Sequence, residues 1–159
     1  MIESQINELA FEVLGQFRSI YGSAKNHFKS IEEQCGISGS QLWILKEVIE
    51  CPNIGITELS KKLSTHQTTC SLLVEKLVKR GLITKERSQE DQRRVGLKST
   101  DDGEAVLKRA PGPVEGILPS ALREMNMESL GALNQSLKTL ISLLKEYDEE
   151  LASKPLADI

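Results

Sequence analysis

Apolar residues in the first part of the chain recur every three or four positions, which is the spacing of one face of an α-helix. The series runs through Ile6, Ala10, Val13, Phe17, Ile20, Ala24, Phe28 and Ile31. It predicts one long helix over residues 2–32, with Gly36 as its stop signal. A second helix is expected over 40–50, capped by Ser38 or Ser40.

Two shorter helices are predicted after the break at residues 52–55. The first covers 57–63 and takes Thr57 as its N-cap, because a threonine hydroxyl accepts a hydrogen bond from the first helical turn. After a tight turn, the second runs from 67 to 80 and ends at Gly81. Two short helices joined in this way are typical of a helix-turn-helix.

A β-hairpin is predicted next. Residues 82–86 form one strand candidate, a polar loop covers 88–93, and Val95 and Leu97 alternate with polar or small residues in a returning strand. The pattern therefore predicts a mainly α fold with a small β-hairpin wing, that is, a winged helix-turn-helix core.

The last third of the chain is predicted to be helical again. Thr100 caps a helix that stops near 110, a short helix covers 114–124, and a last helix begins near Asn126. That helix carries a leucine seam with steps of three and four, made of Leu130, Leu133, Leu137, Leu140, Leu144, Tyr147 and Leu151. The tail over 152–159 is expected to be frayed.

A narrow seam of this kind prefers a partner helix. The long N-terminal helix has a similar rhythm, so the two ends of the chain are expected to pack together, within one chain and across a homodimer. Packing within one chain alone is the other interpretation. We expect a single domain over 1–159, with a winged-helix core at 38–107 and terminal dimerisation helices at 1–34 and 108–152.

The distribution of charge favours a nucleic-acid partner, although the whole chain has a net charge of −3. Residues 75–98 contain eight basic and four acidic side chains, so this segment alone has a charge of +4. Phosphate binding needs a local positive field and not a basic protein as a whole.

Several other classes are disfavoured. The N-terminus has no signal-peptide pattern and no apolar run is long enough to span a bilayer, so we expect a cytoplasmic protein without a membrane partner. Cys35, Cys51 and Cys70 match no metal or disulfide spacing and are expected to be reduced. Cys70 belongs to the core, whereas Cys35 and Cys51 lie near predicted helix ends and are expected to be more accessible. No enzyme motif, metal site or cofactor is predicted.

The segment from Thr69 to Ile83 resembles the recognition helix and following strand of MarR-family regulators. Residues 88–94, Ser-Gln-Glu-Asp-Gln-Arg-Arg, resemble their wing with its Asp-x-Arg hallmark, and residues 97–103 resemble the segment that starts their next helix. The similarity covers about 38–107. It implies a homodimer held by both termini, a pseudo-palindromic DNA operator, and release by an unidentified small-molecule effector or by oxidation. The effector pocket would be lined by parts of 10–28, 42–49 and 106–118.

The start of the predicted recognition helix carries the candidate base contacts, since helix N-termini reach base edges in the major groove. These candidates are His66, Gln67, Thr68, Thr69, Ser71 and Leu72. Glutamine can pair with adenine, and threonine methyls and leucine can meet a thymine methyl. An ordinary solvated helix end is the alternative.

The resemblance further implies that Arg93 enters the minor groove and that Asp91 supports it through a salt bridge. A narrow, electronegative groove favours such a cation. Lys76, Arg87 and Arg94 are candidates for phosphate contacts. The alternative at the wing is a solvated hairpin tip with a weak ion pair. At the level of function, the alternative is a winged-helix protein-interaction module without specific DNA binding.

Overall fold

A computed structural model describes all residues, 1–159, and contains seven α-helices, one two-stranded sheet and two 3-10 helices. In chain order the elements are α1 (Ile2–Cys35), α2 (Gly39–Glu50), α3 (Ile56–Leu63), α4 (Gln67–Lys79), β1 (Ile83–Arg87), β2 (Val95–Ser99), α5 (Asp101–Lys108), α6 (Ile117–Glu124), α7 (Met127–Ser142), η1 (Glu149–Ser153) and η2 (Leu156–Asp158). The predicted fold class, a mainly α winged helix with a hairpin wing, is confirmed.

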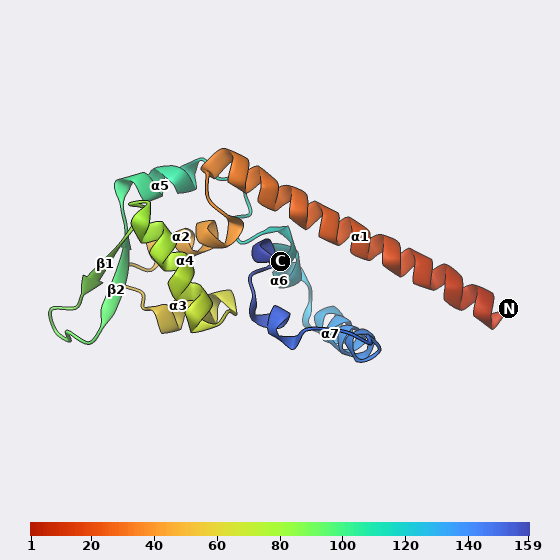
Figure 1. Cartoon of the computed structure of the whole chain (residues 1–159). Helices are drawn as coiled ribbons and strands as arrows, with labels where there is room; N and C mark the ends of the chain where they lie inside the picture. The colour runs from red at the N-terminus through yellow and green to blue at the C-terminus, as the bar shows by residue number, and fades with distance from the viewer.

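The molecule consists of a winged-helix lobe and a long projecting arm (Figure 1). Helices α2 to α5 and the hairpin form the lobe. Helix α1 starts far from the lobe and reaches it only with its C-terminal turns, whereas the C-terminus returns to the middle of the molecule beside α6. The first buried residue of α1 is Ala24, so more than half of this helix is exposed.

The hydrophobic core lies inside the lobe. Leu42 and Leu45 of α2, Leu77 of α4 and Leu97 of β2 are fully buried in it, and Ile31 of α1 joins them. Full burial of such a side chain contributes about 1.5–3 kcal/mol. Neither α6 nor α7 has a buried residue, so these two helices lie outside the core.

Local signals set most of the element ends. Ser38 caps α2 in a capping box with Gln41, and Gly36 ends α1 with a left-handed φ of 71°. Thr100 caps α5 by accepting from the Gly103 N–H at 3.1 Å, and its hydroxyl donates to the Gly81 carbonyl at 2.6 Å. These caps agree with the sequence-based predictions.

The hairpin is antiparallel, with Ile83 opposite Ser99 and Arg87 opposite Val95. An isolated bridge between Ile54 and Leu97 ties the chain before α3 to the other edge of β2. Gly96 permits this approach, because a Cβ there would lie 2.9 Å from the Asn53 Cα. The wing is thereby fixed to the start of α3.

The stretch between α5 and α6 is held on α1 and α2. A ring nitrogen of His27, Nε2, lies 2.8 Å from the carbonyl oxygen of Pro113. Glu115 accepts from Lys46 at 3.5 Å and pairs with Arg123 at 3.2 Å. Burial alone would raise the pKa of Glu115, but a backbone hydrogen bond and these two cations outweigh it and lower the pKa.

Two predictions about helix ends were wrong. Gly55, and not Thr57, is the N-cap of α3, and the Thr57 carbonyl instead accepts from the Ser60 hydroxyl. Helix α7 ends at Ser142, so Leu144, Tyr147 and Leu151 lie beyond it. The hydroxyls of Thr139 and Ser142 bond back to main-chain carbonyls near this end, a contact that competes with helix continuation.

Two further predictions, on Cys35 and on the C-terminal tail, were wrong because both parts of the chain contact the lobe. Cys35 is buried, because α1 runs three residues further than expected and carries this thiol to the Val106 carbonyl of α5. The tail contains the end of η1 and the whole of η2, and η2 packs on α2 instead of fraying. Cys70 is fully buried, as predicted, and Cys51 is half-buried.

Gly103 of α5 offers a test of this packing, because a Cβ there would overlap the Leu82 carbonyl. We expect Gly103→Ala to lower the free energy of unfolding by about 1–3 kcal/mol. The control, Gly15→Ala in α1, has no atom within 4 Å of the added methyl and should be stabilising by up to about 1 kcal/mol. Urea denaturation at equal protein concentration measures both. Equal losses in the two variants would show that the close approach has no role.

Candidate nucleic-acid interface

Helices α3 and α4 form a helix-turn-helix. The turn places Ser64 in the left-handed region at φ 53°, and the Thr65 N–H donates to the Ser60 carbonyl at 3.0 Å. Leu59 and Leu63 of α3 are buried in the same core as Cys70 of α4. The turn is imperfectly satisfied, since the buried hydroxyl oxygen of Thr65 has no hydrogen-bond partner.

Helix α4 has one buried and one exposed face. Cys70, Leu73, Val74 and Leu77 face the core. Burial raises the pKa of the Cys70 thiol to about 11, so this thiol stays protonated at neutral pH and packs as an apolar group. The other face is therefore free for contacts outside the chain.

The predicted contact residues lie on that free face or beside it. His66, Gln67, Thr68, Leu72 and Lys76 are exposed, whereas Thr69 and Ser71 are half-buried. Leu72 is 61% exposed, so its side chain is open to contacts outside the chain. His66 is the N-cap residue of α4, but its side chain makes no cap bond, so the amides of the first turn remain available to an acceptor.

The wing tip is a closed turn. The Ser88 N–H donates to the Arg94 carbonyl at 2.9 Å, and the Arg94 N–H donates to the Asp91 carbonyl at the same distance. The Asp91 carboxylate accepts from the backbone N–H of Arg93 at 3.0 Å. No ion pair joins Asp91 to the Arg93 guanidinium in this structure, so the predicted salt bridge is replaced by a backbone contact. Asp91 shapes the turn and leaves the cation unpaired.

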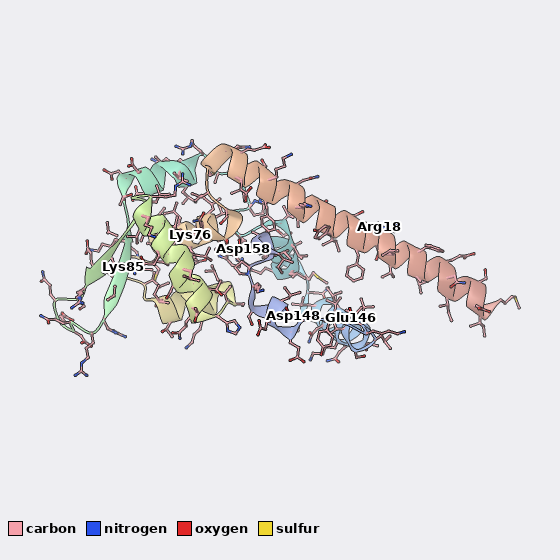
Figure 2. All side chains as sticks on the ribbon, viewed as in Figure 1. Arg18, Lys76, Lys85, Glu146, Asp148 and Asp158 are labelled. Carbon is pink, nitrogen blue, oxygen red and sulfur yellow. The ribbon has the colours of Figure 1, made fainter.

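The cations of this segment fall into two groups. Lys85 pairs with Glu75, and its hydrogen bond and charge lower the pKa of Glu75; Lys98 pairs with Glu86 at 2.7 Å. By contrast, Lys76 of α4 and the wing residues Arg87, Arg93 and Arg94 have no acidic partner. Figure 2 shows Lys76 on α4 and Lys85 on the hairpin. All four cations that the sequence proposed for DNA are unpaired, and so are Lys79 and Arg80, which were not proposed.

A polar groove of about 910 Å³ lies between the wing and the start of α3. Its lining includes all three unpaired wing arginines. Thr57 and Gln89 also line it and were absent from the predicted set. The local sequence pattern does not indicate that the wing lies close to the start of α3. The proximity follows from the bridge between Ile54 and Leu97.

A second, apolar cleft of about 1030 Å³ lies away from the wing. It is lined by α1, by Leu118 and Leu122 of α6, by α7 and by the segment from Leu156 to Ile159. No residue of 42–49 lines it, and within 106–118 only Leu118 does. The predicted lining was wrong there, because α6, α7 and the returning C-terminal segment occupy these positions.

No three His, Cys, Asp or Glu side chains gather as a metal site, and no helix is long and apolar enough to cross a membrane. The arrangement instead provides hydrogen-bond donors, methyl groups and unpaired cations on a helix and a hairpin. Groups of these kinds are the ones that proteins use to bind phosphates and to contact base edges. The fold and this surface define a winged-helix, DNA-binding transcriptional regulator.

The family model of the SarA/Rot transcriptional regulators matches residues 26–109 of this chain. The chain therefore belongs to this family, within the MarR-type winged-helix regulators. The chain is 25% identical over 143 residues to the organic hydroperoxide resistance transcriptional regulator of Bacillus subtilis, covering 88% of this chain and 91% of that protein.

Solved structures show the same fold. The S. aureus MepR–DNA complex matches with a TM-score of 0.56 and 19% identity, covering 80% of this chain and 92% of that one. Staphylococcus aureus MarR in complex with salicylate and kanamycin matches with a TM-score of 0.55 and 22% identity, covering 89% and 98%.

Proposed function

We propose that this protein acts as a homodimer that binds a pseudo-palindromic DNA operator and regulates transcription there. One observation carries the proposal. The exposed face of α4 is flanked by cations that lack acidic partners, whereas Lys85 and Lys98 of the same segment are paired. Unpaired cations remain available to phosphates.

In the proposed complex α4 lies in the major groove. Gln67 pairs with adenine, and Thr68 and Leu72 contact thymine methyl groups. His66, Thr69 and Ser71 flank these contacts at the helix start and bind bases or phosphate. The uncapped amides of the first turn suit a phosphate oxygen, because they coincide with the positive end of the helix dipole.

The wing completes the contact. Arg93 enters the minor groove, where a narrow electronegative channel favours a long planar cation. Asp91 holds the backbone of the turn behind it through the Arg93 N–H. Arg87, Arg94 and Lys76 bind phosphates and set the position of the lobe on the duplex.

Two exposed apolar surfaces support the homodimer. On α1, Ile6 is 61% exposed, Phe17 40% and Ile20 46%, all within the three-four series. Leu140 of α7 is 40% exposed as well. Packing within one chain would cover these surfaces, but here they stay open, and Phe17, Ile20 and Leu140 line a cleft between α1 and α7. Contiguous apolar surfaces of this kind mark interaction sites, and a second copy supplies matching helices.

A small apolar effector is a further part of the proposal. The cleft beside α1 has the size and the largely apolar lining of small-molecule sites. A molecule bound there would contact α1, α6 and α7 together. It would thereby shift the position of one lobe relative to the other in the dimer.

Selection of bound sequences from a random duplex pool tests the operator. The purified protein, at near-physiological salt, should enrich an inverted repeat with half-sites about one helical turn, or about 34 Å, apart. If a folded dimer enriches no sequence, the chain is instead a winged-helix protein-interaction module.

Arg93→Ala tests the wing on the selected duplex. The loss of one minor-groove contact should raise the dissociation constant about tenfold, within the range of about 1–3 kcal/mol for a specific contact. The control is Arg18→Ala, which removes the same charge from the arm, far from the hairpin (Figure 2). A fluorescence anisotropy titration measures both. Equal affinities for Arg93→Ala and the parent protein would remove Arg93 from the interface.

The dimer is tested by two phenylalanines of α1. Phe17→Glu places a charge in the apolar cleft and should weaken dimerisation about 100-fold or more. Phe11→Glu is the control, because Phe11 lies outside the three-four series, points to another face and is 74% exposed. Sedimentation equilibrium gives both dissociation constants. A parent protein that is monomeric at micromolar concentration would refute the homodimer.

A further inference from the structure

The segment from Pro155 to Ile159 returns to the lobe and docks at the start of α2. Helix η2 is in contact with α2, although Ser40 and Asp158 lie 118 positions apart in sequence. Figure 2 shows Asp158 next to α2, and Figure 1 shows the C-terminus there, away from the exposed end of α1. The docked segment therefore connects the C-terminal end of the chain with the winged-helix lobe.

The polar part of this contact centres on Ser40, which is only 2% exposed. Its hydroxyl donates to the Asp158 carboxylate, with Oδ1 at 3.0 Å and Oδ2 at 3.1 Å. The Ser38 hydroxyl lies 3.1 Å from the Ser40 Oγ and also accepts from the Gln41 N–H. Asp158 is thus connected to the capping box of α2, at the end of the helix dipole that favours an anion.

The apolar part depends on Gly39. A Cβ at this position would lie 2.7 Å from the Phe28 Cδ1 and 3.2 Å from the Ala157 Cβ. The absence of a side chain therefore lets both groups approach α2. Leu156 and Ile159 line the apolar cleft together with Phe28, so the segment fills part of the junction between the lobe and the arm.

The effect of this docking depends on how α7 is connected to the lobe. Neither α6 nor α7 has a buried residue. At its N-terminal end α7 is tied to the lobe through α6 and the contacts of Glu115 with Lys46 and Arg123. At its C-terminal end the docked segment is the second connection. One connection permits rotation, whereas two fix an orientation.

We propose that the segment 155–159 is a latch that fixes the dimer arm relative to the winged-helix lobe and so sets the separation of the two recognition helices. This inference rests on the proposed dimeric operator binding. Because α7 presents apolar residues to the second copy, its orientation decides where the partner lobe lies. With the latch docked, the dimer accepts one half-site spacing; with the latch released, it tolerates others.

Asp158→Ala tests the latch, because the change removes the acceptor of the Ser40 hydroxyl and replaces an exposed side chain, which leaves the core intact. The matched control is Glu146→Ala, which has the same charge change in the same part of the chain; the Glu146 side chain is exposed and makes no hydrogen bond or ion pair. Two quantities are compared. The first is amide hydrogen exchange at residues 39–42 without DNA. The second is the affinity ratio between the selected operator and the same operator with one base pair inserted between its half-sites.

The insertion moves one half-site by about 3.4 Å and rotates it by about 34°. The parent and Glu146→Ala should discriminate against the longer operator. Asp158→Ala should accelerate exchange at the start of α2 and reduce this discrimination about fivefold. Unchanged exchange would show that the segment does not dock through Asp158. Faster exchange with unchanged discrimination would show that docking has no influence on spacing. Either result overturns the latch.

Failure of the underlying function has a separate signature. If the parent protein enriches and binds no duplex, operator binding is rejected before any variant is compared, and the spacing role is rejected with it. The exchange measurement then still decides whether the segment docks.

Discussion

The burial of the last turns of α1 in the winged-helix core is the constraint on which the rest of the structure depends. Ile31 is fully buried and Cys35 nearly so, among residues of the lobe helices. This burial makes the long N-terminal helix a rigid extension of the DNA-binding lobe and not a flexible appendage. Its outer turns remain outside any core, because the lobe is too small to cover a helix of 34 residues. In the proposed homodimer, a second chain supplies the missing surface.

The charge of the winged-helix surface differs from that of the chain as a whole. The chain as a whole is acidic, yet the hairpin and α4 keep five cations without acidic partners while two others are paired. Exposed pairs of this kind contribute little to stability. These ion pairs instead change the local electrostatic field, because they neutralise the two positive charges of Lys85 and Lys98 on the hairpin. The wing arginines are then the main source of attraction between the hairpin and phosphate.

The sequence predicted the elements whose limits depend on local chemistry. Gly81, at φ 70°, and the Thr100 cap fixed α4 and α5 to within about two residues, and the amphipathic pattern of α4 separated exposed candidates from core residues. The errors arose where three-dimensional contacts, and not the local sequence, determine the structure. The end of α7, the docking of Asp158 on Ser40 and the backbone role of Asp91 all depend on geometry that periodicity does not encode. The leucine seam was a real apolar pattern, but part of it continues past the helix.

Phe28 lies between two glycines, since a Cβ on Gly39 or on Gly116 would come within 3.2 Å of its ring. The ring therefore touches bare main chain from both α2 and the start of α6. This arrangement limits how the sequence can diverge. A side chain at Gly39 must be accompanied by a smaller residue at 28, whereas Gly116, at φ 101°, disfavours any side chain whatever residue stands at 28. Related proteins with a different angle between lobe and arm should differ at positions 28 and 39 together, as a coordinated pair of changes.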